Sequence, residues 1–186
     1  MDNKRFKMFF GITLIVVILA CASFYIFKQL SSNNDSILEE YVPQQEISDE
    51  QFRRTIVKLY FMEINSDNLK CENRSIDSKE LLSNPYLTLV QMVIAGPTVD
   101  GLEGVIPNDT VVNSAVLSGD SAVIDLSASF TASVSDVNIA SNMVYSIVNT
   151  LTELTEVNSV KFLIDGNDSA NFSNCDFSLK DAFVRK

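Results

Sequence analysis

Apolar and polar residues follow the periods of strands and helices through the C-terminal three quarters of the chain. β-Branched and aromatic residues mark two strands at 55–62 and 69–76, and the polar residues 65–68 between them are typical of a turn. Asn84 followed by Pro85 predicts the start of a helix, because Asn caps a first turn and Pro is tolerated directly after the cap. The pattern therefore predicts a hairpin followed by a helix.

The second half of this region repeats the same order of elements. Two strands are predicted at 110–117 and 122–126, with the turn residues 118–121 between them. A long second helix is marked by apolar residues at helical spacing, namely Ala140, Met143, Val144, Ile147, Leu151 and Leu154. A last strand occupies 160–164. This order predicts an α+β fold of two layers, with a mixed or mainly antiparallel sheet of about five strands and two helices on one face.

Short motifs mark the joints between these elements. In chain order they are Ala95-Gly96-Pro97, Gly101 to Pro107, Val123 to Ser127, Asn149 to Leu154 and Val160 to Gly166. Their order and spacing resemble the GerMN domain family of spore-forming bacteria, over roughly residues 57–166. The resemblance implies a non-enzymatic protein-interaction module that acts in sporulation or germination within an extracytoplasmic membrane complex.

An uncharged apolar run occupies residues 8–27, directly after three basic residues. At the rise of an α-helix this run spans about 30 Å, which is the thickness of the hydrocarbon core of a bilayer. The positive-inside rule then places a tail of residues 1–7 in the cytoplasm, before a transmembrane anchor at 8–28. A polar tether at 29–52 and the GerMN-like domain at 53–186 would lie outside the cell.

A cleaved signal peptide and a lipid anchor are the alternatives to a transmembrane helix. Cys21 follows the small residue Ala20 as in a lipobox, and members of the resembled family are often lipoproteins, so lipidation of Cys21 stays open. The apolar run continues through Phe24–Phe27, beyond the usual apolar region of a signal peptide. That length favours the uncleaved helix, and either anchor would hold the domain at the outer face of the membrane.

The composition narrows the classes of function. The net charge is −10, and an acidic domain repels phosphate backbones, so we expect no nucleic acid partner. The chain has no histidine, which is the commonest general base and metal ligand. Asp125 and Asp165 stand at strand ends, where we interpret them as turn caps and not as an acid–base pair. We therefore expect no catalytic residue, no metal and no cofactor.

The second helix carries polar residues that are nearly uncharged, including Ser141, Asn142 and Asn149. Such a face either contacts another protein or is simply solvated, and the pattern slightly favours solvation. The partners expected for a contact face are other membrane or extracytoplasmic proteins, or a second copy of the chain. The alternative function is an extracytoplasmic lipoprotein that binds a small ligand or a cell-wall fragment.

Two further cysteines, Cys71 and Cys175, fall in the predicted external domain. Thiols outside the cell can form a disulfide, here one that would tie the C-terminal tail to the first hairpin. Spacing along the chain cannot show that two cysteines lie within bonding distance. A disulfide and two free thiols therefore remain equally open.

Overall fold

The computed structural model describes residues 18–29 and 53–186. Residues 18–29 form a helix whose side chains are exposed. Within the described ranges, no helix is both long enough and apolar enough to cross a membrane. The remainder of the predicted anchor, residues 8–17, and most of the tether lie outside the described residues. The helix at 18–29 and the domain at 53–186 belong to two separate units.

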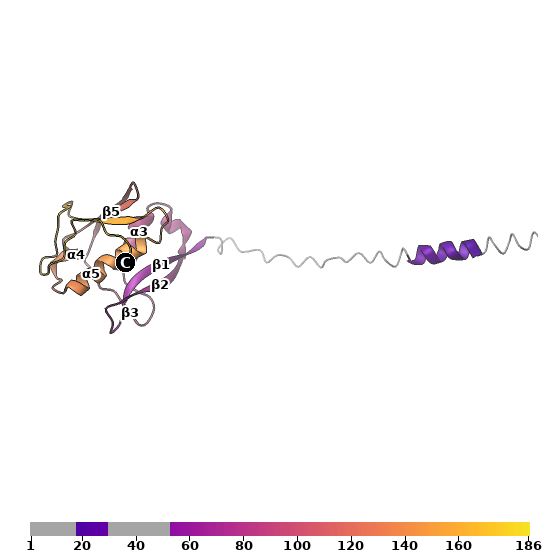
Figure 1. The fold of residues 1–186 in the computed structure, drawn as a ribbon, viewed down its shortest axis with the longest axis horizontal. Coiled ribbons are helices and arrows are strands. Elements are labelled where there is room, and N and C mark those ends of the chain that lie inside the picture. Colours follow the sequence, from indigo (N-terminus) through magenta and orange to yellow (C-terminus); the bar gives the residue numbers. More distant parts are fainter. Residues whose placement is uncertain (1–17, 30–52) are drawn as a thin grey trace, which may run out of the picture. The chain divides into compact units, whose positions relative to one another are not determined.

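The domain consists of two β-hairpins, each followed by a helix, with a closing strand (Figure 1). In chain order the elements are β1 (Arg54–Glu63), β2 (Leu69–Asp77), the 3-10 helix η1 (Ser78–Leu81), α3 (Pro85–Ile94), β3 (Leu102–Glu103), β4 (Val112–Ser118), β5 (Ser121–Leu126), α4 (Ser129–Ala132), α5 (Val137–Leu151) and β6 (Ser159–Ile164). The α+β class and the order of the main elements are confirmed.

The strands form two three-stranded sheets, so the prediction of one sheet with about five strands was wrong. In the first sheet β1 lies between β2 and β3 and is antiparallel to both. In the second sheet β5 lies between an antiparallel β4 and a parallel β6. A parallel pair needs a crossover connection, and α5 supplies it.

The physical reason for two sheets lies in the helices. The helix α3 contacts β1 and β4, and α5 contacts β1 and β6, so each helix is covered by strands of both sheets. Ten of the fifteen residues of α5 are buried. A helix that is apolar on more than one face needs a packing partner on each of those faces. One buried cluster accordingly includes Leu59 of β1, Ile147 of α5 and Phe162 of β6.

Local caps fix where the two main helices begin. The Asn84 side chain accepts a hydrogen bond from the Leu87 amide at 3.0 Å, as its position before Pro85 predicts. The Asp136 side chain accepts one from the Asn138 amide at 2.7 Å at the start of α5. Between β4 and β5, Gly119 has a φ of 67°, which glycine adopts without steric cost.

The C-terminal tail closes the outer edge of β6. The amides of Phe183 and Val160 each donate to the other's carbonyl at 2.8 Å, so Phe183 forms an antiparallel bridge with β6. Beside this bridge five aromatic rings pack in stacked, tilted or edge-to-face pairs, with centroids 5.6–6.0 Å apart; they are Phe130, Phe162, Phe172, Phe177 and Phe183. The tail therefore adds a short edge element to the second sheet.

Candidate functional site

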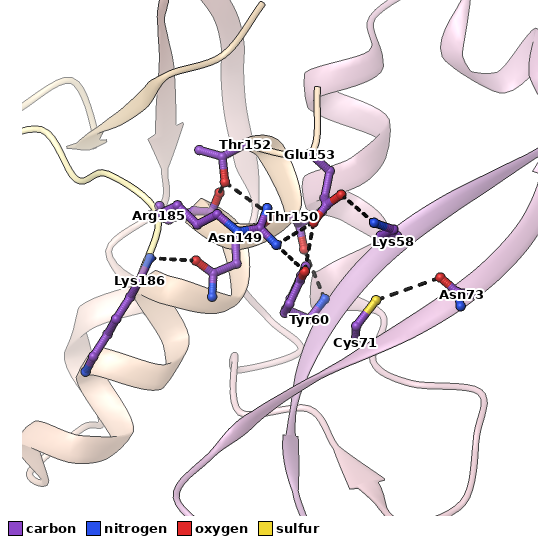
Figure 2. Close-up of polar contacts among 11 residues, drawn as sticks. Lys58, Tyr60, Cys71, Asn73, Asn149, Thr150, Thr152, Glu153, Arg185 and Lys186 are labelled. Carbon is purple, nitrogen blue, oxygen red and sulfur yellow. Dashed lines mark hydrogen bonds and ion pairs between the residues drawn. The ribbon is translucent and has the colours of Figure 1, made fainter. Parts of the chain in front are cut away.

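A cluster of polar side chains gathers where β1, the end of α5 and the C-terminal tail meet (Figure 2). Its members are Lys58, Tyr60, Thr150, Glu153 and Arg185, and we call it the Glu153 cluster. The Tyr60 hydroxyl donates to Glu153 Oε1 at 2.8 Å, and Lys58 Nζ lies 3.0 Å from Glu153 Oε2. The Arg185 guanidinium donates to both Glu153 and Tyr60. Three side chains, two from β1 and one from the tail, therefore share one carboxylate.

The period of β1 places two of these side chains on one face. Lys58 and Tyr60 are two residues apart, so both point away from the core, whereas Leu59 between them is fully buried. The Tyr60 amide donates to Thr150 Oγ1 at 3.1 Å, which joins the backbone of β1 to α5. The Arg185 guanidinium carbon lies 5.2 Å from the centre of the Tyr60 ring. The cluster thus fixes the tail and α5 to the first sheet.

The pKa values of Glu153 and Tyr60 are both shifted away from the physiological pH range. Partial burial alone would raise the pKa of Glu153, but the hydrogen bonds from Tyr60, Arg185 and Lys58 outweigh it and lower that pKa to about 2. Burial, with the hydrogen bond and charge of Glu153, raises the pKa of Tyr60 to about 12. A general acid or base works best with a pKa near the ambient pH. These two groups instead keep fixed protonation states, which suits a structural contact.

A second, more buried polar cluster connects β2 to the turn after α3. The Glu72 side chain is only 2% exposed and its Oε1 lies 2.7 Å from Arg74 Nη2. Glu72 also accepts from the Thr98 amide at 2.9 Å and from the Thr98 hydroxyl at 2.7 Å, and Arg74 donates to the Gly96 carbonyl at 2.9 Å. Burial alone would raise the pKa of Glu72, but these hydrogen bonds lower it below its usual range. Every charge here has a partner, as buried charges require.

The structure places the predicted contact residues of α5 mostly inside the domain. Asn142 and Asn149 are 8% and 5% exposed, and only Ser141 remains half-buried. The Asn142 amide donates to the Asp67 carbonyl at 3.0 Å, and Asn149 Oδ1 accepts from the Lys186 amide at 3.2 Å. The expectation of a solvated face was therefore wrong. The turn after β1 and the C-terminal tail cover most of it, because uncharged polar groups can be buried when they are hydrogen-bonded.

Two hollows flank the Glu153 cluster. The first, of about 260 Å³, lies over the covered face of α5 and is lined by Tyr60, Asp67, Asn68, Leu69, Asn142, Tyr145, Asn149 and Lys186. The second, of about 210 Å³, runs beside β1 and is lined by Thr55, Ile56, Val57, Lys58, Leu81, Leu89, Thr150, Glu153 and Leu154. The first hollow is rich in amides and phenols, and the second is mainly apolar.

The cysteines are free thiols in the part of the chain that the structure describes. Cys71 lies on β2 opposite Tyr60, and Cys175 lies in the tail against the core. The residue before Cys175, Asn174, donates to the Ala132 carbonyl at the end of α4. The structure therefore contains no disulfide between them. Cys21 is exposed on the helix 18–29.

The aspartates at the strand ends accept hydrogen bonds at turns, as interpreted from the sequence. Asp125 Oδ1 accepts from the Gly166 amide at 3.0 Å, and Asp165 Oδ2 accepts from the Ala128 amide at 3.2 Å. Across residues 18–29 and 53–186, no three cysteine or carboxylate side chains gather as a metal site would require.

Sequence reasoning missed the members of both polar clusters. Lys58 and Tyr60 stand in an apolar strand at alternate positions, which is a weak signal for a common face. Glu153 and Arg185 are separated from them by about ninety residues or more along the chain, and sequence spacing says nothing about contacts of that range.

Comparison with known proteins identifies relatives of this domain. A family model described as Germane, sporulation and spore germination, matches residues 58–170. The fold is similar to the first GerMN domain of the sporulation protein GerM from Bacillus subtilis, with a TM-score of 0.56 and 22% identity over 70% of this chain and 98% of that chain. A search of curated proteins found no match.

The tandem GerMN domains of the same Bacillus subtilis protein match with a TM-score of 0.55 and 20% identity, over 73% of this chain and 47% of that chain. The chain thus spans about half the length of the tandem structure. At these identities the likeness shows a shared fold.

Proposed function

Since this chain belongs to the Germane family of sporulation and spore germination domains, we propose that it is a non-enzymatic protein-interaction module. The module acts in sporulation or germination, as part of a membrane complex outside the cytoplasm. The family match over residues 58–170 is the observation that carries this proposal. The fold shared with the GerMN domains of the Bacillus subtilis sporulation protein supports it.

The polar chemistry of the domain is consistent with a module that binds and does not catalyse. Glu153 and Glu72, the most heavily hydrogen-bonded carboxylates of the two clusters, are held ionised by cations and hydroxyls. The Tyr60 phenol, with a pKa of about 12, stays protonated across the physiological range. A general acid or base works best with a pKa shifted the other way, toward the ambient pH.

The N-terminal sequence supplies the proposed anchor. The uncharged run of residues 8–27 after three basic residues supports a single pass, with the N-terminus inside and the domain outside. Lipidation of Cys21 is the alternative anchor. Metabolic labelling with an alkyne fatty acid distinguishes the two, because only a lipidated Cys21 incorporates the label, and Cys21→Ala then abolishes it.

In-cell crosslinking through growth and sporulation tests the interaction proposal. The packing of Arg185 and Lys186 makes the C-terminus a poor site for a tag, so an epitope is better inserted in the exposed loop at Val99–Asp100. We expect crosslinking to capture membrane or extracytoplasmic proteins during sporulation. Capture of no protein at any stage would contradict the proposal.

A second candidate function is the binding of a small ligand or cell-wall fragment. The hollow of about 260 Å³ favours it, because two tyrosines and three asparagines converge there. Its volume lies just below the usual range for ligand pockets, which begins at about 300 Å³. N-Acetylglucosamine or muramyl dipeptide would then raise Tm progressively as its concentration rises above Kd, and Tyr145→Ala would remove the effect.

A further inference from the structure

The strand β1 has an unpaired edge along its first half. The Glu63 amide donates to Asn68 on the β2 side, and the Ile64 amide donates to Gly101 on the β3 side. Odd-numbered residues of β1 therefore bond to β2, and even-numbered residues face the other side. The short strand β3 covers that side only at Met62 and Glu63.

The even-numbered residues nearer the start of β1 have no strand beside them. The Tyr60 amide donates to the side chain of Thr150 on α5, so the contact of α5 with this edge ends at Tyr60. Among the described residues, no strand lies opposite Ile56 or Lys58 on this side. Their N–H and C=O groups therefore point outward, and an open edge of this kind is a template for another strand.

Side chains around this edge favour an extended segment. The hollow of about 210 Å³ lies directly beside Thr55–Lys58, with Leu81, Leu89 and Leu154 in its wall. The Ile56 side chain stands on the outer face and is 70% exposed. A strand added here would turn alternate side chains into the apolar hollow and place the others on the outer face.

The charges on the outer face of β1 determine which kind of extended segment this edge can bind. Arg54, Ile56 and Lys58 share this face because they are two residues apart. Two copies of β1 paired antiparallel about Ile56 would place Arg54 opposite the Lys58 of the other copy, and like charges directly opposite are destabilising. A partner strand with acidic side chains would instead form attractive pairs with both Arg54 and Lys58.

Lys58 is able to accept such a partner. It shares Glu153 with Arg185 and Tyr60, so Glu153 keeps two donors if Lys58 turns to another carboxylate. Arg54 is exposed at the start of the strand. The edge therefore offers two cations at a spacing of four residues, in a protein whose net charge is −10.

We propose that the edge of β1 at Arg54–Lys58 binds an extended segment of a partner protein as an additional strand. The segment carries acidic side chains opposite Arg54 and Lys58, an apolar side chain opposite Ile56, and small apolar side chains in between. This inference rests on the proposed interaction function and gives it a surface and a mode of recognition.

Fluorescence anisotropy with a labelled peptide, Ser-Asp-Val-Ile-Val-Glu-Ser, and the full chain in mild detergent tests the proposal. We expect saturable binding, and no binding of the peptide with lysine in place of both acidic residues. The double variant Arg54→Glu with Lys58→Glu should weaken binding by about tenfold, because two attractive cross-strand pairs become repulsive. The matched control Lys70→Glu, on β2, should leave it unchanged.

A second pair of variants tests the backbone contact. Ile56→Pro removes an outward N–H, which an edge strand tolerates, and should abolish peptide binding without loss of fold. Ile56→Thr keeps that N–H and should retain most of the binding. Equal binding by these two variants, or equal weakening by Lys70→Glu and the double variant, would overturn the proposal. Failure of the wild-type chain to bind the peptide would also overturn the proposal. The cations would then serve only to prevent unwanted pairing at this edge.

The in-cell crosslinking separates this inference from the function on which it rests. Loss of a captured partner in the Ile56→Pro variant, but not in Ile56→Thr, would support both. Partners that are captured equally by wild type and Ile56→Pro would leave the interaction function intact and overturn the role of this edge. Capture of no partner by the wild type would remove the function itself.

Discussion

The two sheets of this domain differ in how their strand edges are covered. The second sheet is closed at β6 by the backbone of Phe183, and a cluster of aromatic rings packs beside that bridge. The first sheet is held to the rest of the domain by charged and polar side chains, and β1 is left open at Ile56 and Lys58. Closure by apolar packing gives stability, whereas an edge bounded by polar contacts remains available to a partner.

Removal of an aromatic ring from the second sheet should have the largest effect. Phe162 is fully buried between Phe130 and Phe183. We expect Phe162→Ala to lower the free energy of unfolding by about 4 kcal/mol, because it deletes a large buried side chain and leaves a cavity. Urea unfolding followed by circular dichroism measures this. Phe162→Leu should cost clearly less, and equal losses would contradict a cavity as the cause.

Breaking the buried ion pair of the first sheet should come next. Glu72→Ala leaves the Thr98 amide without its acceptor and Arg74 without its charged partner, at an expected cost of about 3 kcal/mol. The control is Glu63→Ala, whose exposed pair with Lys70 should contribute less than about 1 kcal/mol. If the two variants unfold at the same urea concentration, the Glu72 cluster does not stabilise the first sheet.

The half-exposed Glu153 cluster should contribute less, and in a way that depends on pH. Glu153→Gln should cost about 1–2 kcal/mol at pH 7, because it removes a charged acceptor from three donors. The folded-state pKa is lowered to about 2, so this stabilisation is present above the ordinary carboxyl pKa of 4.5 and is lost as the pH falls toward 2. Wild type and variant should therefore converge in stability in acid, and a constant difference from pH 7 to pH 2 would contradict this account.

The smallest effect concerns the thiols. Cys71 lies on the first sheet and Cys175 lies in the tail, and both are free. A reducing agent should therefore leave Tm unchanged, and both thiols should react with iodoacetamide in the unfolded protein. A mass lower by two hydrogen atoms, or a Tm that falls on reduction, would show a covalent tie between these regions.

The sequence predicted the local elements of this fold better than their assembly. Asn84, Pro85 and the turn at Gly119 act through neighbouring residues, so hairpins and helix starts follow from short patterns. The division into two sheets depends on what covers each face of α3 and α5. The lack of charge at Asn142, Ser146 and Asn149 was the available signal, because burial excludes unpaired charges more strongly than amides or hydroxyls.

Sequence patterns could not predict the candidate surfaces, because these surfaces also depend on how distant elements assemble. The Glu153 cluster joins residues that are distant in the chain, and the open edge of β1 is defined by how far β3 extends beside it. Strand alternation predicts which side chains of β1 share a face, but not which backbone groups lack a partner. Only the register of the sheet supplies that information.

The central position of α5 has a consequence for how the domain opens. Because α5 contacts strands of both sheets, neither sheet can detach without exposing the apolar side chains of this helix to water. The amides in the middle of α5 should therefore exchange with deuterium only through complete unfolding, whereas those at the start of β1 exchange through local fluctuations. The domain is thus expected to remain one cooperative unit while a single strand edge stays accessible to its surroundings.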